Sequence, residues 1–178
     1  MKYATLVADP PWEIGDFPAN LHAQGMGNKP CPYPTLTVEE IADLPISDLA
    51  ERHAHLYLWT TNQFLEDAYF VARSWKFTPV KVLVWVKAPK GRGLGGTFAS
   101  ATEYVLFCKR GSLAATGRVE RNWWQWPRGP HSAKPEAFLD IVEQVSPGPY
   151  LEMFARRARF GWDYWGNESL ETVEMEVA

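Results

Sequence analysis

Short apolar runs rich in β-branched residues alternate with amphipathic segments, and this alternation restricts the fold more than any other feature of the chain. The runs predicted to be strands cover residues 3–9, 54–61, 78–87, 102–110 and 148–156, with a turn or short strand at 161–168. The segments with helical periodicity cover residues 37–51, 62–75 and 134–145. Strands that alternate with helices predict an α/β domain with a mostly parallel central sheet flanked by helices.

Local patterns predict where several of these elements begin and end. Thr37 and Glu40 have the spacing of a capping box, and Pro45 is expected to divide the segment that follows into two short helices. Asn62 is the expected N-cap of the next helix. Residues 13–37 are rich in Gly, Pro and Asn and too numerous for a simple connector, so we expect a functional loop there.

The length of 178 residues fits one domain at 1–168, followed by an acidic tail at 169–178. The start of the chain lacks the length and cleavage site of a signal peptide, and no apolar run approaches the roughly 18 residues of a membrane span. We therefore expect a cytoplasmic protein with no membrane partner. The two cysteines, Cys31 and Cys108, indicate neither a disulfide framework nor a cysteine-based metal site.

Charge is distributed unevenly along the chain. Residues 1–72 carry 3 basic and 10 acidic side chains, residues 73–134 carry 12 and 2, and residues 135–178 carry 3 and 9. A basic block between acidic flanks is typical of a surface that binds a polyanion, and the flanks would limit promiscuous binding. The composition therefore favours nucleic acid as a partner.

Asp9, Pro10, Pro11 and Trp12 come directly after the first predicted strand, where parallel sheets bind their ligands. Each proline fixes its own φ near about −65° and restrains the preceding residue, so the carbonyl groups of Asp9 and Pro10 point in fixed directions. A row of acceptors beside an indole suits a planar group that carries an NH2, such as a nucleobase amine. The residues alone leave a second interpretation equally open, namely a stiff turn with Trp12 in the core.

Seven motifs occur in one order: "ADPPW", "PYPTLT", "LYLWTT", "VWVK", "HSAKPE", "SPGPYLEMFARR" and "GWDYWGNE". This order resembles the MT-A70-like adenine N6-methyltransferases over residues 3–168, and the last two motifs are most similar to the bacterial and phage branch. The resemblance implies a Rossmann-like methyltransferase fold that uses S-adenosylmethionine. It also implies the permuted motif order of the β class, with the catalytic motif early and the cofactor strand late.

The resemblance assigns roles to individual residues. Asp9 and the Pro10 carbonyl would hold the adenine N6 amine, with Pro11 and Trp12 completing the catalytic motif, and Lys134 would pair with the carboxylate of the cofactor's methionine moiety. The expected cofactor-binding residues are Ala8, Asp9, Lys134, Phe154, Arg156, Asn167 and Glu168. The expected substrate-binding residues are Trp12, Tyr33, Lys87, Glu103, Arg121 and Ser132, and no metal is expected.

Two features of the sequence depart from the family pattern. Only eight residues precede Asp9, whereas longer members carry an additional strand and loop that help to enclose the cofactor adenine. Ala158 and Arg159 stand where the large RNA-modifying relatives have a His-Asn pair, so those two contacts are not carried over.

Three further patterns carry less weight. The segment 91–96, "GRGLGG", matches a dinucleotide fingerprint but precedes a predicted strand, so we expect a basic flap over the substrate or a surface loop. His53 and His55 lack a third metal ligand at suitable spacing. The segment 121–128 interleaves arginines with tryptophans, and we expect a mixed role in packing and in stacking on bases.

We therefore expect an S-adenosylmethionine-dependent adenine N6-methyltransferase that acts on nucleic acid, with DNA favoured over RNA and the adenine flipped out of a duplex. The alternatives are RNA methylation by the same site and a catalytically idle nucleic-acid-binding or scaffold subunit. Because 178 residues leave no room for a separate recognition domain, we expect specificity that is short, relaxed or supplied by a partner. That partner would be a second copy of the chain or a specificity subunit.

Overall fold

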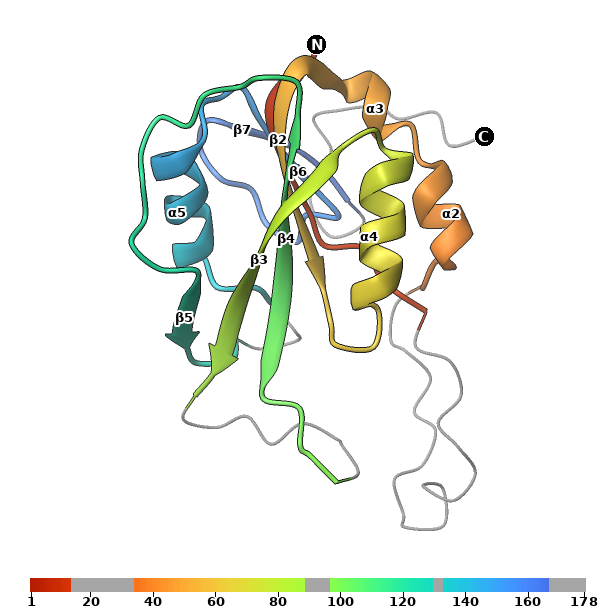
Figure 1. The fold of residues 1–178 in the computed structure, drawn as a ribbon, viewed down its shortest axis with the longest axis vertical. Helices are drawn as coiled ribbons and strands as arrows, with labels where there is room; N and C mark the ends of the chain where they lie inside the picture. Colours follow the sequence, from red (N-terminus) through yellow and green to blue (C-terminus); the bar gives the residue numbers. More distant parts are fainter. Residues whose placement is uncertain (14–33, 89–96, 130–132, 167–178) are drawn as a thin grey trace.

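The computed structural model describes residues 1–13, 34–88, 97–129 and 133–166, which form a central sheet with helices on both faces (Figure 1). The strands are β1 (Tyr3–Ala8), β2 (Ala50–Thr60), β3 (Thr78–Lys87), β4 (Thr102–Arg110), β5 (Trp123–Trp126), β6 (Tyr150–Met153) and β7 (Trp162–Trp165). The helices are α2 (Val38–Asp43), α3 (Ile46–Leu49), α4 (Leu65–Ser74) and α5 (Ala137–Val145).

The sheet has the order β5-β3-β4-β2-β1-β6-β7. Strand β4 is antiparallel to both of its neighbours, whereas every other pair of adjacent strands is parallel. The carboxyl ends of the parallel strands and the amino end of β4 therefore meet at one edge. This arrangement confirms the predicted fold class, a Rossmann-like α/β fold with a mostly parallel sheet between helices.

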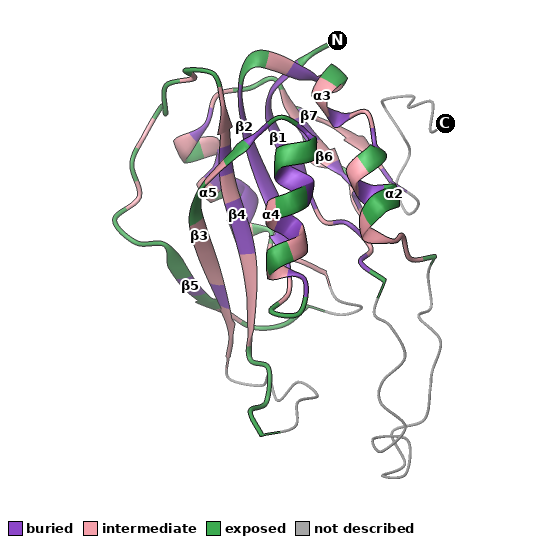
Figure 2. Cartoon of the chain, turned by 45° about the vertical axis from the view of Figure 1, so that its right-hand side comes forward, coloured by how far each residue is buried: buried purple, intermediate pink, exposed green. Residues whose placement is uncertain are grey.

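The two faces of the sheet form two separate cores. Successive residues of β1 point to opposite faces, as strand geometry requires, so Leu6 packs with α2, α3 and α4 whereas Val7 packs with α5. Figure 2 shows β1 and β2 buried in the middle of the molecule, with the outward faces of the helices exposed. Asp9 thus follows a strand that is covered on both sides.

The predicted helix ends are partly confirmed. The capping box is present, because Glu40 N–H donates to Thr37 Oγ1 and Thr37 N–H donates to Glu40 Oε2, and α2 and α3 are separated around Pro45 as expected. The prediction of Asn62 as an N-cap is wrong, since α4 begins at Leu65 and its N-cap, Phe64, makes no capping bond. Tertiary packing of Phe64 determines this helix start instead.

Strand β5 was not predicted from the sequence. It pairs in parallel with β3 at the edge of the sheet, with Trp124 opposite Trp85 and Trp126 opposite Lys87. The expected short strand in 161–168 is present as β7. Among the described helices, none is long and apolar enough to cross a membrane.

Candidate active site

Four charged side chains meet at the edge where the parallel strands end. Asp9 follows β1, Lys87 is the last residue of β3, Glu103 is the second residue of β4, and Lys134 precedes α5. Glu103 reaches this edge only because β4 is antiparallel to β3, in the register that pairs it with Trp85.

Ion pairs join these four residues into one network. Lys134 Nζ lies 2.9 Å from Asp9 Oδ1 and 3.1 Å from Glu103 Oε2, and Lys87 Nζ pairs with the other oxygen of Glu103. The side chains of Asp9 and Lys134 are each 21% exposed, and those of Glu103 and Lys87 are 13% and 12% exposed. Two cations and two carboxylates thus compensate each other in a largely desolvated cluster.

Two tryptophans form an aromatic floor below this network. Lys134 Nζ lies 5.4 Å from the ring centroid of Trp59, and Lys87 Nζ lies 5.3 Å from that of Trp85. The two indoles contact each other edge to face, with centroids 6.0 Å apart. These rings hold both ammonium groups in place by cation–π attraction.

The network separates the proton affinities of its two acids. Burial raises the pKa of Asp9 above its ordinary value, against the opposing effects of Lys134 and Arg156. Burial also acts on Glu103, but Lys134 and Lys87 outweigh it and hold the pKa of Glu103 below its ordinary value. Burial would lower the pKa of Lys134, yet the two carboxylates raise it overall, so this ammonium stays charged. Asp9 is therefore the stronger proton acceptor of the pair.

Backbone hydrogen bonds hold the segment after Asp9. The Pro10 carbonyl accepts from Trp12 N–H at 2.9 Å, and the Pro11 carbonyl accepts from Leu36 N–H at 2.9 Å. Asp9 N–H donates to the Met153 carbonyl of β6 at 3.4 Å. Because a carbonyl oxygen has two lone pairs, the Pro10 carbonyl keeps one that can accept from a ligand.

Trp12 lies in the core and not on the open side of the site. Its side chain is 7% exposed, its ring stacks on Phe64 with centroids 5.5 Å apart, and its Nε1–H donates to the Trp59 carbonyl at 3.1 Å. So little exposed ring cannot form the aromatic wall expected for a substrate base. The structure instead gives Trp12 the role of an anchor for the two prolines, as the second interpretation of the motif had it.

Several residues expected to bind the cofactor lie beside Asp9. Ala8 is fully buried at the end of β1, and Phe154 follows β6 in the left-handed region, with φ 59°. The ends of β6 and β7 approach closely, since a Cβ on Gly166 would lie 2.5 Å from Ala155 N. Arg156 is near enough to lower the pKa of Asp9. This edge therefore gathers Ala8, Phe154, Arg156 and Lys134 around the Asp9 carboxylate.

Other predicted site residues lie elsewhere. Arg121 precedes the amino end of β5, five residues from Trp126, which pairs with Lys87. At about 3.3 Å per residue this separates Arg121 from the charged network by roughly 16 Å. Tyr33, Ser132, Asn167 and Glu168 lie outside the described residues, as do Cys31 and the 91–96 segment.

Glu152 belongs to this region but was not predicted. Burial raises its pKa to about 7, and the Asp9 carboxylate adds to this effect. The available indication in the sequence was an acid within a predicted apolar strand. In the structure Glu152 pairs in register with Val7 of β1.

The two described histidines and the described cysteine make hydrogen bonds or pack away from the charged network. His55 is buried, with Nδ1 2.7 Å from the Ser146 hydroxyl and Nε2 3.2 Å from the Leu113 carbonyl, whereas His53 Nδ1 accepts from Ser112 N–H. Within the described part of the chain, no group of three His, Cys, Asp or Glu side chains could hold a metal ion. Cys108 is free and buried, and burial raises its pKa to about 12.

Comparison with known proteins places this geometry in a family. The MT-A70 family model matches residues 3–168. The chain belongs to the MT-A70 family. This confirms the resemblance derived from the seven motifs, and the family is one of methyltransferases.

Individual MT-A70 relatives cover the chain almost completely. Type II methyltransferase M.MunI of a Mycoplasma species is 30% identical over 182 residues, which cover 94% of this chain and 78% of that protein. The human N(6)-adenosine-methyltransferase catalytic subunit METTL3 is 25% identical over 94% of this chain and 28% of its own length. Mouse N(6)-adenine-specific methyltransferase METTL4 is 25% identical over 98% of this chain and 39% of its own length. The chain thus spans well under half of these two mammalian proteins.

Proposed function

We propose that this chain transfers the methyl group of S-adenosylmethionine to N6 of adenine in DNA. The observation that carries the proposal is the Asp9 carboxylate, which lies at the carboxyl end of the buried strand β1, bound to Lys134 and next to Pro10 in the chain. Membership of the MT-A70 family supports methyl transfer to adenine. Similarity to a type II methyltransferase supports DNA as the polymer.

Asp9 and the Pro10 carbonyl would activate the amine by accepting hydrogen bonds from its two N–H groups. The N6 nitrogen is a poor nucleophile while its lone pair is conjugated with the ring. Hydrogen bonds to two acceptors favour the pyramidal amine, whose lone pair is free to attack. Because burial raises the pKa of Asp9, its carboxylate is a stronger acceptor than an exposed one. Catalysis then consists of positioning and electrostatics.

The donor set at this edge fits the charged groups of S-adenosylmethionine. An ammonium carries three N–H donors, so Lys134 retains one for the cofactor's carboxylate beyond its contacts with Asp9 and Glu103. The Asp9 carboxylate would lie beside the sulfonium, whose electrophilic methyl group is the chemistry that the cofactor supplies. Ala8, Phe154 and Arg156, with Asn167 and Glu168, complete the proposed cofactor site.

The substrate side of the proposal uses the other half of the charged network. Glu103 and Lys87 would lie near the target base or its ribose, together with Tyr33 and Ser132. Sequence specificity would be short or would come from a second copy of the chain or another subunit.

The proposal is tested by incubating the protein with labelled S-adenosylmethionine and, separately, duplex DNA, single-stranded DNA and RNA. We expect N6-methyladenine in DNA, no product with Asp9→Ala, and normal product with Glu13→Ala, which removes a nearby exposed acid. Absence of both product and cofactor binding would contradict the proposal. Product in RNA alone would overturn the assignment of DNA and keep the chemistry.

A further inference from the structure

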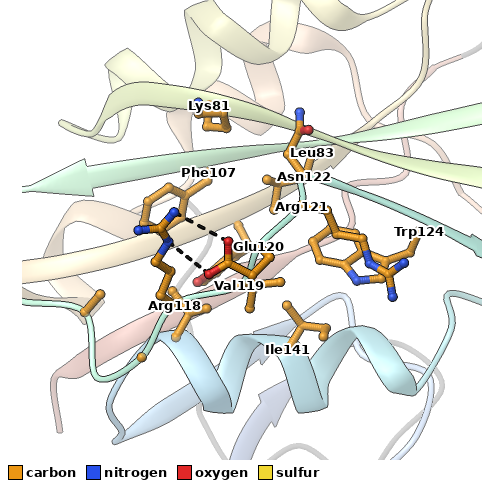
Figure 3. A pocket seen from close by; sticks show the side chains of 14 residues that line it. Lys81, Leu83, Phe107, Arg118, Val119, Glu120, Arg121, Asn122, Trp124 and Ile141 are labelled. Carbon is orange, nitrogen blue, oxygen red and sulfur yellow. Dashed lines mark hydrogen bonds and ion pairs between the residues drawn. The ribbon is translucent and has the colours of Figure 1, made fainter.

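A cavity of about 570 Å³ lies between the sheet and α5 (Figure 3). None of its described lining residues belongs to the Asp9 network. Its floor includes Leu83 of β3, Phe107 of β4 and Trp124 of β5, and Ile141 of α5 forms the opposite wall. The connection from β4 to β5 passes over it. A volume of this size is within the range of sites that enclose a small organic ligand.

The cavity combines an apolar floor with a cationic mouth. Lys81, Arg118 and Arg121 line it, and Glu120 is the one acid among the described lining residues. Figure 3 shows Glu120 paired with Arg118. The two side chains lie 3.3 Å apart, but both are more than 80% exposed, so water screens this pair. A ligand with a flat apolar part and an anionic part would match this surface, and a nucleotide has both.

The cavity lies on the same face of the sheet as the charged network. Trp124 and Trp126 of β5 stack with centroids 5.7 Å apart and 3° between their planes, and Trp126 pairs with Lys87. Leu83 on the cavity floor precedes Lys87 by four residues of one strand, or about 13 Å. A stacked strand rises about 3.4 Å per nucleotide and an unstacked strand is more extended, so this separation corresponds to at most about four nucleotides.

We propose that the cavity binds one nucleotide of the substrate strand, at most about four positions from the target adenine. The base enters against the half-buried side chains of Leu83 and Phe107, and Arg118 and Arg121 contact its phosphate. Only an unpaired base can enter, so the contact favours single-stranded or locally opened substrate. This inference rests on the proposed function and adds to it a subsite that affects substrate affinity and leaves the chemical step unchanged.

The test uses single-stranded oligodeoxynucleotides with one adenine and a thymidine flank of increasing length on one side or the other. We expect the KM for methylation to fall roughly tenfold when one flank reaches about four nucleotides, with kcat constant, as the gain of one charge-assisted contact with base burial would give. The affinity of the protein for the same oligonucleotides, measured by fluorescence, should rise by the same factor at the same flank length. Free mononucleotide should compete only weakly, because the rest of the strand is missing.

Two variants test whether the cavity causes this fall in KM. Ala115→Trp fills the mouth from an exposed backbone position, and Arg118→Gln removes a phosphate contact. Each should abolish the fall in KM and leave the shortest substrate unaffected, and Arg118→Gln should also reduce the slope of log affinity against log salt concentration by about 1. Arg73→Gln is the matched control, since Arg73 belongs to the same basic block but lies on α4, across the sheet.

The inference would be overturned if the fall in KM persists in both variants, or if neither flank produces it. Failure of the proposed function would look different, because no oligonucleotide of any length would then be methylated. In that case the fluorescence measurement still decides whether the cavity binds the flank.

Discussion

Replacement of Lys134 by methionine removes the cation that Asp9 and Glu103 share. Both carboxylates lie about 3 Å from its Nζ, at 2.9 and 3.1 Å, and no more than 21% of either side chain is exposed. Removal of one partner from a buried ion pair lowers the free energy of unfolding by about 3–5 kcal/mol. Because these side chains stay partly exposed, we expect a loss of about 3 kcal/mol. For a chain of this size we expect Tm to fall by roughly 6–12 °C.

The loss should also depend on pH, in a direction set by the carboxylates. Burial already raises the folded-state pKa of Asp9, and without Lys134 it rises further above its ordinary value of 3.8. The folded variant then holds a proton that the unfolded chain releases, so stability is retained at low pH and lost as pH rises toward the raised pKa. Urea unfolding of both proteins at about pH 4.5 and about pH 8 measures this difference.

The double variant Lys134→Met/Asp9→Asn is the control for this argument. It removes the carboxylate that loses its lysine partner in Lys134→Met, whereas Glu103 keeps its ion pair with Lys87, so it should recover part of the lost stability. An equal deficit at both pH values, or no recovery in the double variant, would refute the electrostatic explanation.

Three further predictions use urea unfolding. Trp12→Ala should cost about 3–5 kcal/mol by leaving a cavity beside Phe64, whereas Trp12→Phe should cost about 1 kcal/mol for the lost bond to the Trp59 carbonyl, and equal effects would contradict the anchoring role. Burial lowers the pKa of His55 below 6.5, so wild-type stability should fall as pH drops below that value, and His55→Gln should flatten this limb. Burial raises the pKa of Glu152 from 4.5 to about 7, so its contribution to stability falls as pH rises between these values, and Glu152→Gln should be more stable than wild type near about pH 8.

Features that depend on neighbouring residues were predictable from the sequence. The capping box of Thr37 and Glu40 and the helix break at Pro45 require only contacts within a few residues, and both are present. Asn62 had the residue type of an N-cap, but the ring of Phe64 stacks on Trp12 and shifts the helix start. No local pattern contains that contact.

Strand β5 was missed for a related reason. Its four residues, "WWQW", are too short for a clear alternation, and they form a strand because β3 offers an edge with which to pair. The pairing partner lies about 40 residues earlier in the chain, so the information is in the topology and not in the segment.

In the candidate site, too, the local chemistry was predictable from the sequence, whereas the contacts set by the topology were not. The resemblance singled out Asp9, Glu103 and Lys134, but their convergence depends on β1 lying inside the sheet, between β2 and β6, and on β4 running antiparallel. The acceptor geometry of the two prolines was predictable from their chemistry. The sequence left two positions open for Trp12, in the core or against a base, since its burial depends on Phe64 and on the Trp59 carbonyl.

The central claim is that the Asp9 carboxylate accepts a hydrogen bond from the adenine amine. Asp9→Asn tests it most directly, because the side chain keeps its shape while one acceptor oxygen becomes an NH2 donor. With saturating S-adenosylmethionine and a DNA oligonucleotide, we expect the rate of N6-methyladenine formation, measured by mass spectrometry of the nucleosides, to fall on the order of 10²–10³-fold. Formation of N6-methyladenine by Asp9→Asn at the wild-type rate would contradict the account.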